Sequence, residues 1–161
     1  MSSLPLYKVI VAADSSSPSQ QAIMHGVELC QRVAPNPCRL IIIHVTALNP
    51  RSSLPYIDNM EKSFNYEIKV SEKQEIQLCK DFIERSVADK VPYDFVQIEG
   101  EGDVGPLIEE FVKESHPDTN MLVLGTRNLG TVQRWALGSV SDYCLHHVTC
   151  PVLIVKDTAA Q

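Results

Sequence analysis

The 161-residue sequence predicts an α/β fold: a doubly wound, five-stranded parallel sheet with helices on both faces. Short apolar runs rich in β-branched residues, typical of strands buried on both faces, recur along the chain. They alternate with segments whose apolar residues return every three or four positions, as on one face of a helix. Neither an internal repeat nor a linker interrupts this alternation, so residues 1–161 are expected to form a single domain.

The first strand is predicted at residues 7–13, an apolar run that ends at Asp14. Ser17 is placed to cap the next helix, with Pro18 at its first position and Gln20 completing a capping box. One face of that helix carries the apolar residues Ala22, Ile23, Gly26, Val27, Cys30 and Val33. Two prolines after Val33 end it.

The next segments predict a second strand at residues 39–45 and a long loop at residues 47–59, which holds two prolines. A helix is predicted from residue 60 to about residue 90. The remaining elements are expected to be a strand at 93–98, a turn at 100–103, a helix whose apolar stripe spans 104–112, a strand at 121–124, a helix at 139–147 and a strand at 151–155.

A candidate phosphate-binding loop follows the fourth strand. Gly125 and Gly138 allow close approach of backbone N–H groups, and Ser139 and Ser141 add hydroxyls where a helix begins. The segment from Gly125 to Ser141 also holds two arginines and no acidic residue. A plain turn followed by a helix capped by Ser139 explains the pattern equally well.

A second glycine pattern, G-x-G-x-x-G, starts at Gly100, after a strand and before a helix. Its Glu101 and Asp103 would repel a pyrophosphate, and the acidic ribose ligand expected about 20 residues on is replaced by Asn120 and apolar residues. The pattern therefore favours a tight turn in which Asp103 caps a helix. The sequence contains no G-x-x-x-x-G-K-[ST] motif, which excludes a P-loop nucleotidase.

Composition narrows the classes of partner. The formal net charge of −6 argues against nucleic-acid binding, and the sequence has no apolar run of about 20 residues that could span a membrane. Residues 1–8 lack the features of a signal peptide. Five cysteines without framework spacing predict reduced thiols and a cytoplasmic protein.

Metal binding and catalysis are not predicted. Cys144, His146, His147 and Cys150 lie on or next to one helix, so they cannot converge on a closed zinc site, and Cys144 is expected in the core. His44 is expected to be a hydrogen-bonded sheet residue. No set of nucleophile, base and orienting group can be assembled, so any ATP hydrolysis would be slow.

The sequence resembles the universal stress protein family along nearly its whole length. The resemblance is carried by Asp14, His44-Val45, Gly102-Asp103, Gly125-Thr126-Arg127, Gly138-Ser139-Val140-Ser141 and Cys150-Pro151-Val152-Leu153-Ile154-Val155. The ATP-binding branch of that family has a G-x2-G-x9-G-[S/T] loop. Here Gly125 and Gly138-Ser139 match the motif, and Asn128 replaces its second glycine.

The resemblance implies a sheet in the order 3-2-1-4-5 with ATP or AMP at the gap between the first and fourth strands. Adenine and ribose would contact Ala12, Asp14 and Val45. The phosphates would contact Gly125, Arg127, Asn128, Gly138, Ser139, Val140 and Ser141. Mg²⁺ or Mn²⁺ would accompany the nucleotide as its counter-ion.

The favoured hypothesis is a stress-response or regulatory module that binds an adenine nucleotide. The alternative is an interaction protein of the same fold that has lost the nucleotide through Asn128. A dinucleotide-dependent enzyme would need a substrate domain for which this length leaves no room. The apolar last strand, at an expected sheet edge, together with the resemblance, predicts a homodimer that pairs this strand with its copy.

Overall fold

A computed structural model of the chain describes residues 5–126 and 137–157. Its strands are β1 (Tyr7–Ala12), β2 (Cys38–Leu48), β3 (Tyr93–Glu101), β4 (Met121–Thr126) and β5 (Val152–Lys156). Its α-helices are α1 (Ser17–Arg32), α2 (Pro55–Ser86), α3 (Val104–Glu110), which runs into a π-helical turn at Phe111–Ser115, and α4 (Ser139–His147). All strand pairs are parallel, and the order β3-β2-β1-β4-β5 confirms the predicted fold class.

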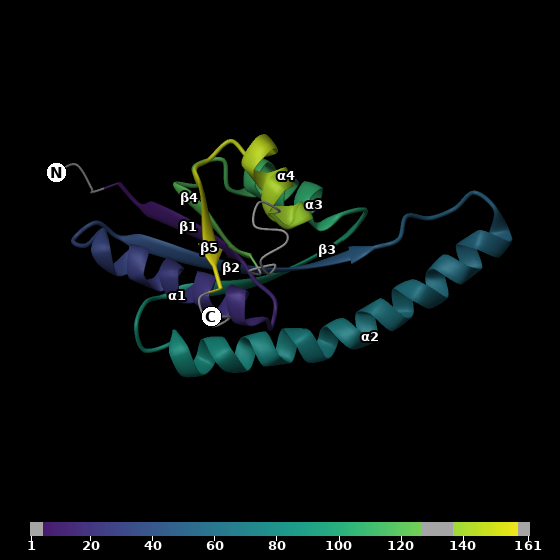
Figure 1. The fold of residues 1–161 in the computed structure, drawn as a ribbon, viewed down its shortest axis with the longest axis horizontal. Helices are drawn as coiled ribbons and strands as arrows, with labels where there is room; N and C mark the ends of the chain where they lie inside the picture. Colours follow the sequence, from purple (N-terminus) through teal and green to yellow (C-terminus); the bar gives the residue numbers. More distant parts are fainter. Residues whose placement is uncertain (1–4, 127–136, 158–161) are drawn as a thin grey trace.

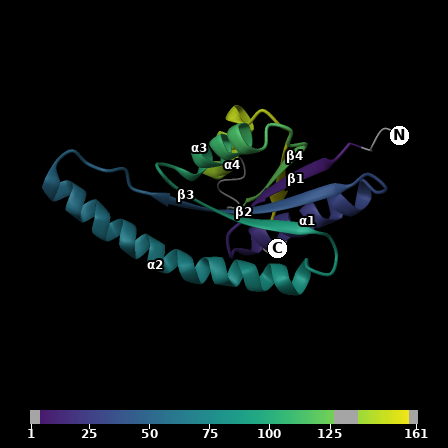
Figure 2. The same cartoon turned by 180° about the vertical axis from the view of Figure 1, so that it is seen from behind.

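The helices form two layers, with α1 and α2 on one face of the sheet and α3 and α4 on the other (Figures 1 and 2). Each strand alternates between two apolar clusters. Val9 and Val11 of β1 pack in the cluster that includes α1 and α2, whereas Ile10 packs in the cluster of α3 and α4. Because both faces are buried, the strands have the nearly continuous apolar runs seen in the sequence.

Helix α1 begins one residue earlier than the sequence predicts. Ser16 is the N-cap, and its Oγ accepts a hydrogen bond from the N–H of Ser19 at 3.4 Å. The Gln20 side chain donates to the carbonyl of Ser15 instead of closing a capping box. The predicted cap at Ser17 and the capping box are therefore wrong, because three consecutive serines offer equivalent caps and tertiary contacts select one.

The predicted loop at 47–59 is largely wrong. Strand β2 continues to Leu48, and the 32-residue α2 starts at Pro55, with its N-terminal half extending past the sheet (Figure 1). Pro55 stands in the first turn of the helix, where a missing N–H costs nothing. Strand β3 also extends to Glu101, in register with Leu48, so Gly100 and Glu101 belong to a strand.

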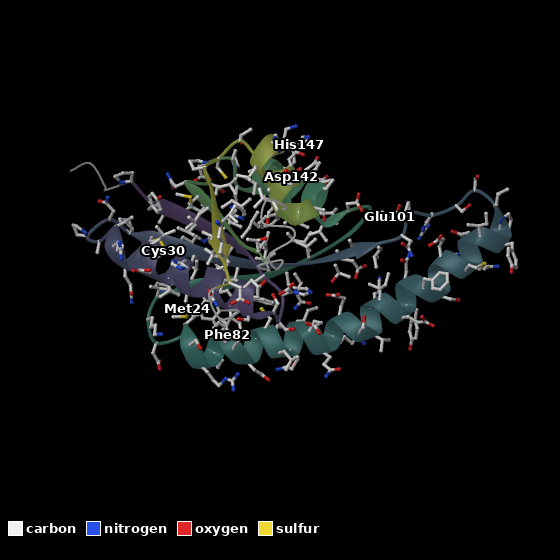
Figure 3. The ribbon with its side chains drawn as sticks, viewed as in Figure 1. Met24, Cys30, Phe82, Glu101, Asp142 and His147 are labelled. Atoms are coloured by element: carbon white, nitrogen blue, oxygen red, sulfur yellow. A yellow bond between two sulfur atoms is a disulfide. The ribbon has the colours of Figure 1, made fainter. Side chains whose placement is uncertain are left out.

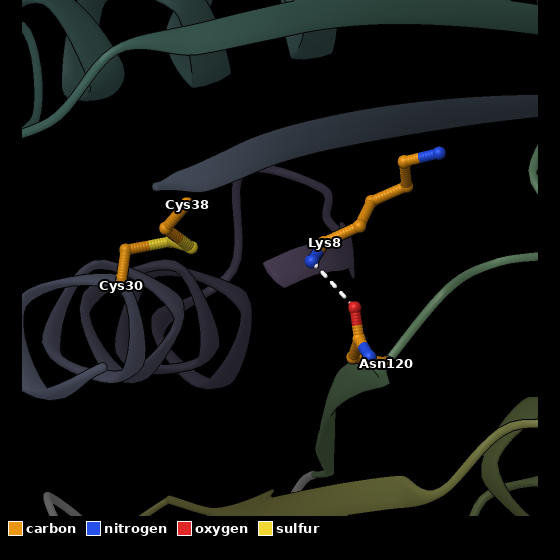
Figure 4. Close-up of a disulfide and its surroundings, with 4 residues drawn as sticks. All are labelled: Lys8, Cys30, Cys38 and Asn120. Carbon is orange, nitrogen blue, oxygen red and sulfur yellow. Dashed lines mark hydrogen bonds between the residues drawn. A yellow bond between two sulfur atoms is a disulfide. The ribbon is translucent and has the colours of Figure 1, made fainter. Parts of the chain in front are cut away.

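Two of the five cysteines are not reduced. Cys30 at the end of α1 and Cys38 at the start of β2 form a disulfide with their Cα atoms 5.2 Å apart (Figure 4). The prediction of reduced thiols is wrong for this pair. The chain turns back after α1 and enters β2, which brings Cys38 next to Cys30, eight positions earlier. Cysteine content thus no longer supports the cytoplasmic address, which stays a prediction. The same figure shows the N–H of Lys8 donating to Asn120 Oδ1 at 2.7 Å, which joins β1 to the chain entering β4.

Two features are missing from residues 5–126 and 137–157. No helix there is long and apolar enough to cross a membrane. No group of three or more His, Cys, Asp or Glu side chains there is arranged to hold a metal ion.

Candidate functional site

The strand order reverses between β1 and β4, because the chain builds β2 and β3 on one side of β1 and then β4 and β5 on the other. A cavity of about 570 Å³ opens at the carboxyl ends of these strands. It is lined by Ala12, Ala13, Asp14, Ser19, Ile43, His44, Val45, Glu72, Val104, Ile108, Leu124, Gly125, Thr126, Gly138, Ser139, Val140 and Ser141. Such switch points are where open α/β sheets bind ligands, and the volume is that of a small-molecule pocket.

Eight of the ten predicted site residues line this one cavity. They are Ala12, Asp14, Val45, Gly125, Gly138, Ser139, Val140 and Ser141. The other two, Arg127 and Asn128, lie outside the described residues, as does Arg134. The tertiary structure therefore brings segments around residues 12, 45, 125 and 138 to a single wall.

Gly125 and Gly138 serve different purposes in the cavity wall. A Cβ on Gly125 would lie 2.4 Å from the carbonyl oxygen of Pro18, so this glycine lets β4 approach the start of α1. A Cβ on Gly138 would meet nothing within 4 Å. Gly138 therefore leaves open space beside the cavity, and packing against residues 5–126 and 137–157 gives no reason for a glycine there.

The N-terminus of α4 supplies hydrogen-bond donors to the cavity. The first N–H groups of any α-helix have no acceptor within the helix. In α4 the N-cap is Gly138, which has no side chain that could accept a hydrogen bond from them. Ser139, Val140 and Ser141 follow in the cavity wall. Backbone N–H groups, two hydroxyls and the positive end of a helix dipole together suit an anion such as phosphate.

Asp14 has a structural role at the end of β1. Its Oδ1 accepts the N–H of Ser16 at 2.8 Å, and its own N–H donates to Ser19 Oγ at 3.1 Å. Asp14 thus forms part of the turn that leads from β1 into α1. The Asp14 side chain is exposed and lines the cavity, so it lies within the space that a ligand would occupy.

The contribution of α2 to the cavity was not predicted from the sequence. Glu72 lines the cavity, and its Oε2 lies 2.5 Å from Nε2 of the buried His44, while Glu75 accepts from the Ser15 hydroxyl. The available signal was the position of Glu72, four residues after Ile68 and four before Ile76, in the stripe that faces the sheet. His44 itself is hydrogen-bonded as predicted.

The described part of the cavity is acidic. Asp14 and Glu72 are its carboxylates, and no lysine or arginine is among the described lining residues. Nearby, burial raises the pKa of the Cys79 thiol to about 11, and the negative charges of Asp14 and Glu75 add to this rise. Within the described chain, the N-terminus of α4 is a source of positive potential at the site.

A second hollow, of about 670 Å³, lies between α1 and α2. Met24 and Phe82 line it from the two helices, and Figure 3 shows both in the region where α1 and α2 face each other. It runs along α1 from Ser17 to Gln31 and not along the β1/β4 switch point, and the N-terminus of α1 that it reaches is already capped by the side chain of Ser16. The cavity at the switch point is therefore the stronger candidate.

The glycines at 100–105 form no second phosphate site. Gly102 has a φ of +103°, and its N–H donates to the carbonyl of Leu48, which closes a tight turn. Asp103 is the N-cap of α3, although its side chain makes no capping hydrogen bond. Gly105 packs against the Tyr143 ring. The turn predicted from the sequence is confirmed in this respect.

The cysteines and histidines of α4 also occupy the positions expected of structural residues. Cys144 is buried, and this burial raises the pKa of its thiol to about 11. His146 and His147 lie in the last turn, each with Nδ1 at 2.8 Å from the carbonyl four residues earlier.

The sequence matches known proteins along most of its length. Residues 6–156 match the model of the universal stress protein family. A universal stress protein of Bacillus subtilis is 29% identical over 152 residues, which cover 92% of this chain and 98% of that protein. One from Synechocystis sp. is 27% identical over 152 residues and covers 92% and 97%.

Solved structures share the fold at lower identity. A universal stress protein family member from Arabidopsis thaliana, solved with AMP bound, has a TM-score of 0.59 at 23% identity and covers 95% of this chain and 93% of its own. A universal stress protein in complex with cAMP has a TM-score of 0.60 at 18% identity and covers 93% and 96%. On the family match and this shared fold, the chain belongs to the universal stress protein family.

Proposed function

We propose that this chain binds an adenine nucleotide, ATP or AMP, at the β1/β4 switch point and acts as a stress-response or regulatory module. The observation that carries the proposal is the position of the α4 N-terminus. Its first N–H groups, which have no acceptor within the helix, and its serine hydroxyls border a cavity at the point where the strand order reverses, where open α/β sheets bind ligands. In this proposal the whole chain acts as one nucleotide-binding domain.

Each side of the cavity has a different chemistry. Ala12 and Val45 supply apolar surface for adenine, and Asp14 accepts a hydrogen bond from ribose. The phosphates lie against the glycines and the α4 terminus, at Gly125, Gly138, Ser139, Val140 and Ser141. Arg127 and Asn128 complete this group, and Mg²⁺ or Mn²⁺ accompanies the phosphates.

The solved relatives support this assignment by their ligands. One is described with AMP bound and another with cAMP. Both ligands contain adenine, ribose and phosphate. The open space beside Gly138 is consistent with a bound group there, because no atom of the described residues lies within 4 Å of a Cβ at this position.

The first test is mass spectrometry of nucleotide that co-purifies with the protein, followed by calorimetric titration with ATP, AMP and adenosine. ATP or AMP in the purified protein, with measurable rebinding, is the expected result. If neither is found and neither binds, the alternative of an interaction protein without nucleotide replaces the proposal. NAD or FAD would instead indicate a dinucleotide-dependent protein.

The second test is Gly138→Val. The backbone angles of Gly138, φ −61° and ψ 153°, suit any residue, so the fold should tolerate valine while the phosphate region loses its space. ATP binding should be abolished without any fall in the unfolding midpoint. Ser63→Val, at an exposed position of α2 outside the cavity, is the matched control. Unchanged ATP affinity in Gly138→Val would rule out the phosphate assignment.

A further inference from the structure

His44 is a buried imidazole in the cavity wall, with hydrogen-bonding groups on both ring nitrogens. The residue is 3% exposed. Its Nδ1 lies 3.1 Å from the carbonyl oxygen of Ala13, and its Nε2 lies 2.5 Å from Glu72 Oε2. Among the described residues, Glu72 is the only one of α2 that lines the cavity.

Both of these partners accept hydrogen bonds. A carbonyl oxygen never donates, and an ionised carboxylate is also an acceptor only. A neutral imidazole has one N–H, so it would leave one acceptor facing a lone pair in a buried position, which is costly. The Glu72 side chain is 28% exposed, so its carboxylate is in contact with solvent. The geometry therefore indicates an imidazolium that donates to both partners.

We propose that the proton on the His44–Glu72 contact holds the end of β1 in position for the nucleotide, so that affinity falls as this proton is lost. This inference rests on the proposed function. It makes His44 a positioning residue, since it acts through the main chain of Ala13 and through Glu72. Asp14, which follows Ala13 directly, is the group it positions.

The hydrogen bonds around Ala13 show how the coupling works. The N–H of Ala13 donates to the carbonyl of Ile43 at 2.9 Å, and the carbonyl of Ala13 faces His44. Asp14 is then held by Ser16 and Ser19. Loss of one proton removes either the bond to Ala13 or the bond to Glu72, whichever tautomer remains. Either the end of β1 or helix α2 then loses its hydrogen bond to His44 at the wall of the cavity.

Charge acts in the same direction. Glu72 and Glu75 come from α2 and Asp14 from the end of β1, while the neutral Gln97 is in register with His44 on β3. Glu99 lies two positions after Gln97 on β3 and forms an ion pair with Lys69 of α2, so this pair adds no net charge. Deprotonation of His44 therefore leaves an unbalanced negative charge beside the cavity, which repels an anionic nucleotide.

The test compares ATP affinity by calorimetry from about pH 6 to about pH 9, a range that includes ordinary imidazole titration. One bound proton changes affinity by up to about tenfold per pH unit, so the parent protein should bind ATP more weakly as the pH rises. Glu72→Gln offers Nε2 an amide N–H in place of a proton-dependent contact. Its affinity should vary less steeply with pH than that of the parent.

The matched control is Glu28→Gln. Glu28 faces His25 at 3.6 Å in an exposed pair on α1, outside the cavity. This variant should keep the slope of the parent, and protonation of ATP itself is common to all three proteins. Equal slopes in Glu72→Gln and the parent would overturn the inference while the proposed function stands. Absence of ATP binding in the parent at every pH would instead overturn the proposed function.

A measurement on the unaltered protein does not depend on any variant folding. ¹⁵N NMR of the imidazole should show both ring nitrogens of His44 protonated near neutral pH without nucleotide. A neutral His44 ring at the low end of the pH range would overturn the inference.

Discussion

The two glycines of the cavity wall predict opposite changes in stability when each is replaced by alanine. In Gly125→Ala the new Cβ would lie 2.4 Å from the Pro18 carbonyl oxygen and 2.8 Å from the Ser19 nitrogen. These are backbone atoms at the start of α1, which cannot rotate away. In Gly138→Ala the new Cβ meets nothing within 4 Å, and the backbone has a negative φ of −61°.

The magnitudes follow from these contacts. Extra volume in a packed contact costs about 1–3 kcal/mol, so Gly125→Ala should lower the free energy of unfolding by that amount. A loss of about 2 kcal/mol would lower the Tm by roughly 4–8 °C in a chain of this size. Gly138→Ala should raise the free energy of unfolding by about 0.4–1 kcal/mol, because alanine restricts the unfolded chain.

The assay is urea denaturation of both variants and the parent without nucleotide, followed by far-ultraviolet circular dichroism. The m-value should be unchanged, so that the midpoint alone reports stability. Equal shifts in the two variants would refute the reasoning. So would a destabilised Gly138→Ala, since that result would mean that Gly138 serves the fold and not a ligand.

Four further predictions concern the buried thiols, the two arginines and the edge strand. The thiols of Cys79 and Cys144, with pKa values raised from 9.0 to about 11, should resist alkylation near pH 8 until urea unfolds the protein. The unfolded chain loses these protons first as the pH rises from 9.0 to about 11, so the free energy of unfolding should fall over that interval, and urea midpoints measure it. Replacing Arg127 and Arg134 together with alanine should weaken ATP more than adenosine in calorimetry, and equal losses would mean that neither arginine meets the phosphates. We propose a homodimer through the edge strand β5, so light scattering should give a dimer mass for the parent and a monomer mass for a folded Ile154→Lys variant, whereas a monomeric parent would contradict it.

Local sequence patterns determined the element types, and together with the family resemblance they predicted eight of the residues that line the candidate cavity. Helix α4 begins at Ser139 and ends at His147, as predicted, because glycine before it and the periodic residues within it are local signals. The apolar runs of the five strands specify a sheet buried on both faces, and such a sheet has its ligand site at the carboxyl edge. The glycine and serine pattern then identified which loop lies there.

Contacts between distant residues decided the rest. The extension of β2 to Leu48 depends on β3, which runs beside it to Glu101 and satisfies its backbone groups. The disulfide depends on the position of the start of β2 beside the end of α1, which brings Cys38 next to Cys30.

The pairing of His44 with Glu72 shows the same limit at the site itself. These residues are separated by 28 positions, and only the course of α2 across the sheet brings their side chains together. A sequence pattern records which face of a helix is apolar, but it carries no information on which strand that face meets. The tertiary structure alone therefore determines that this carboxylate meets a buried imidazole at the edge of the cavity.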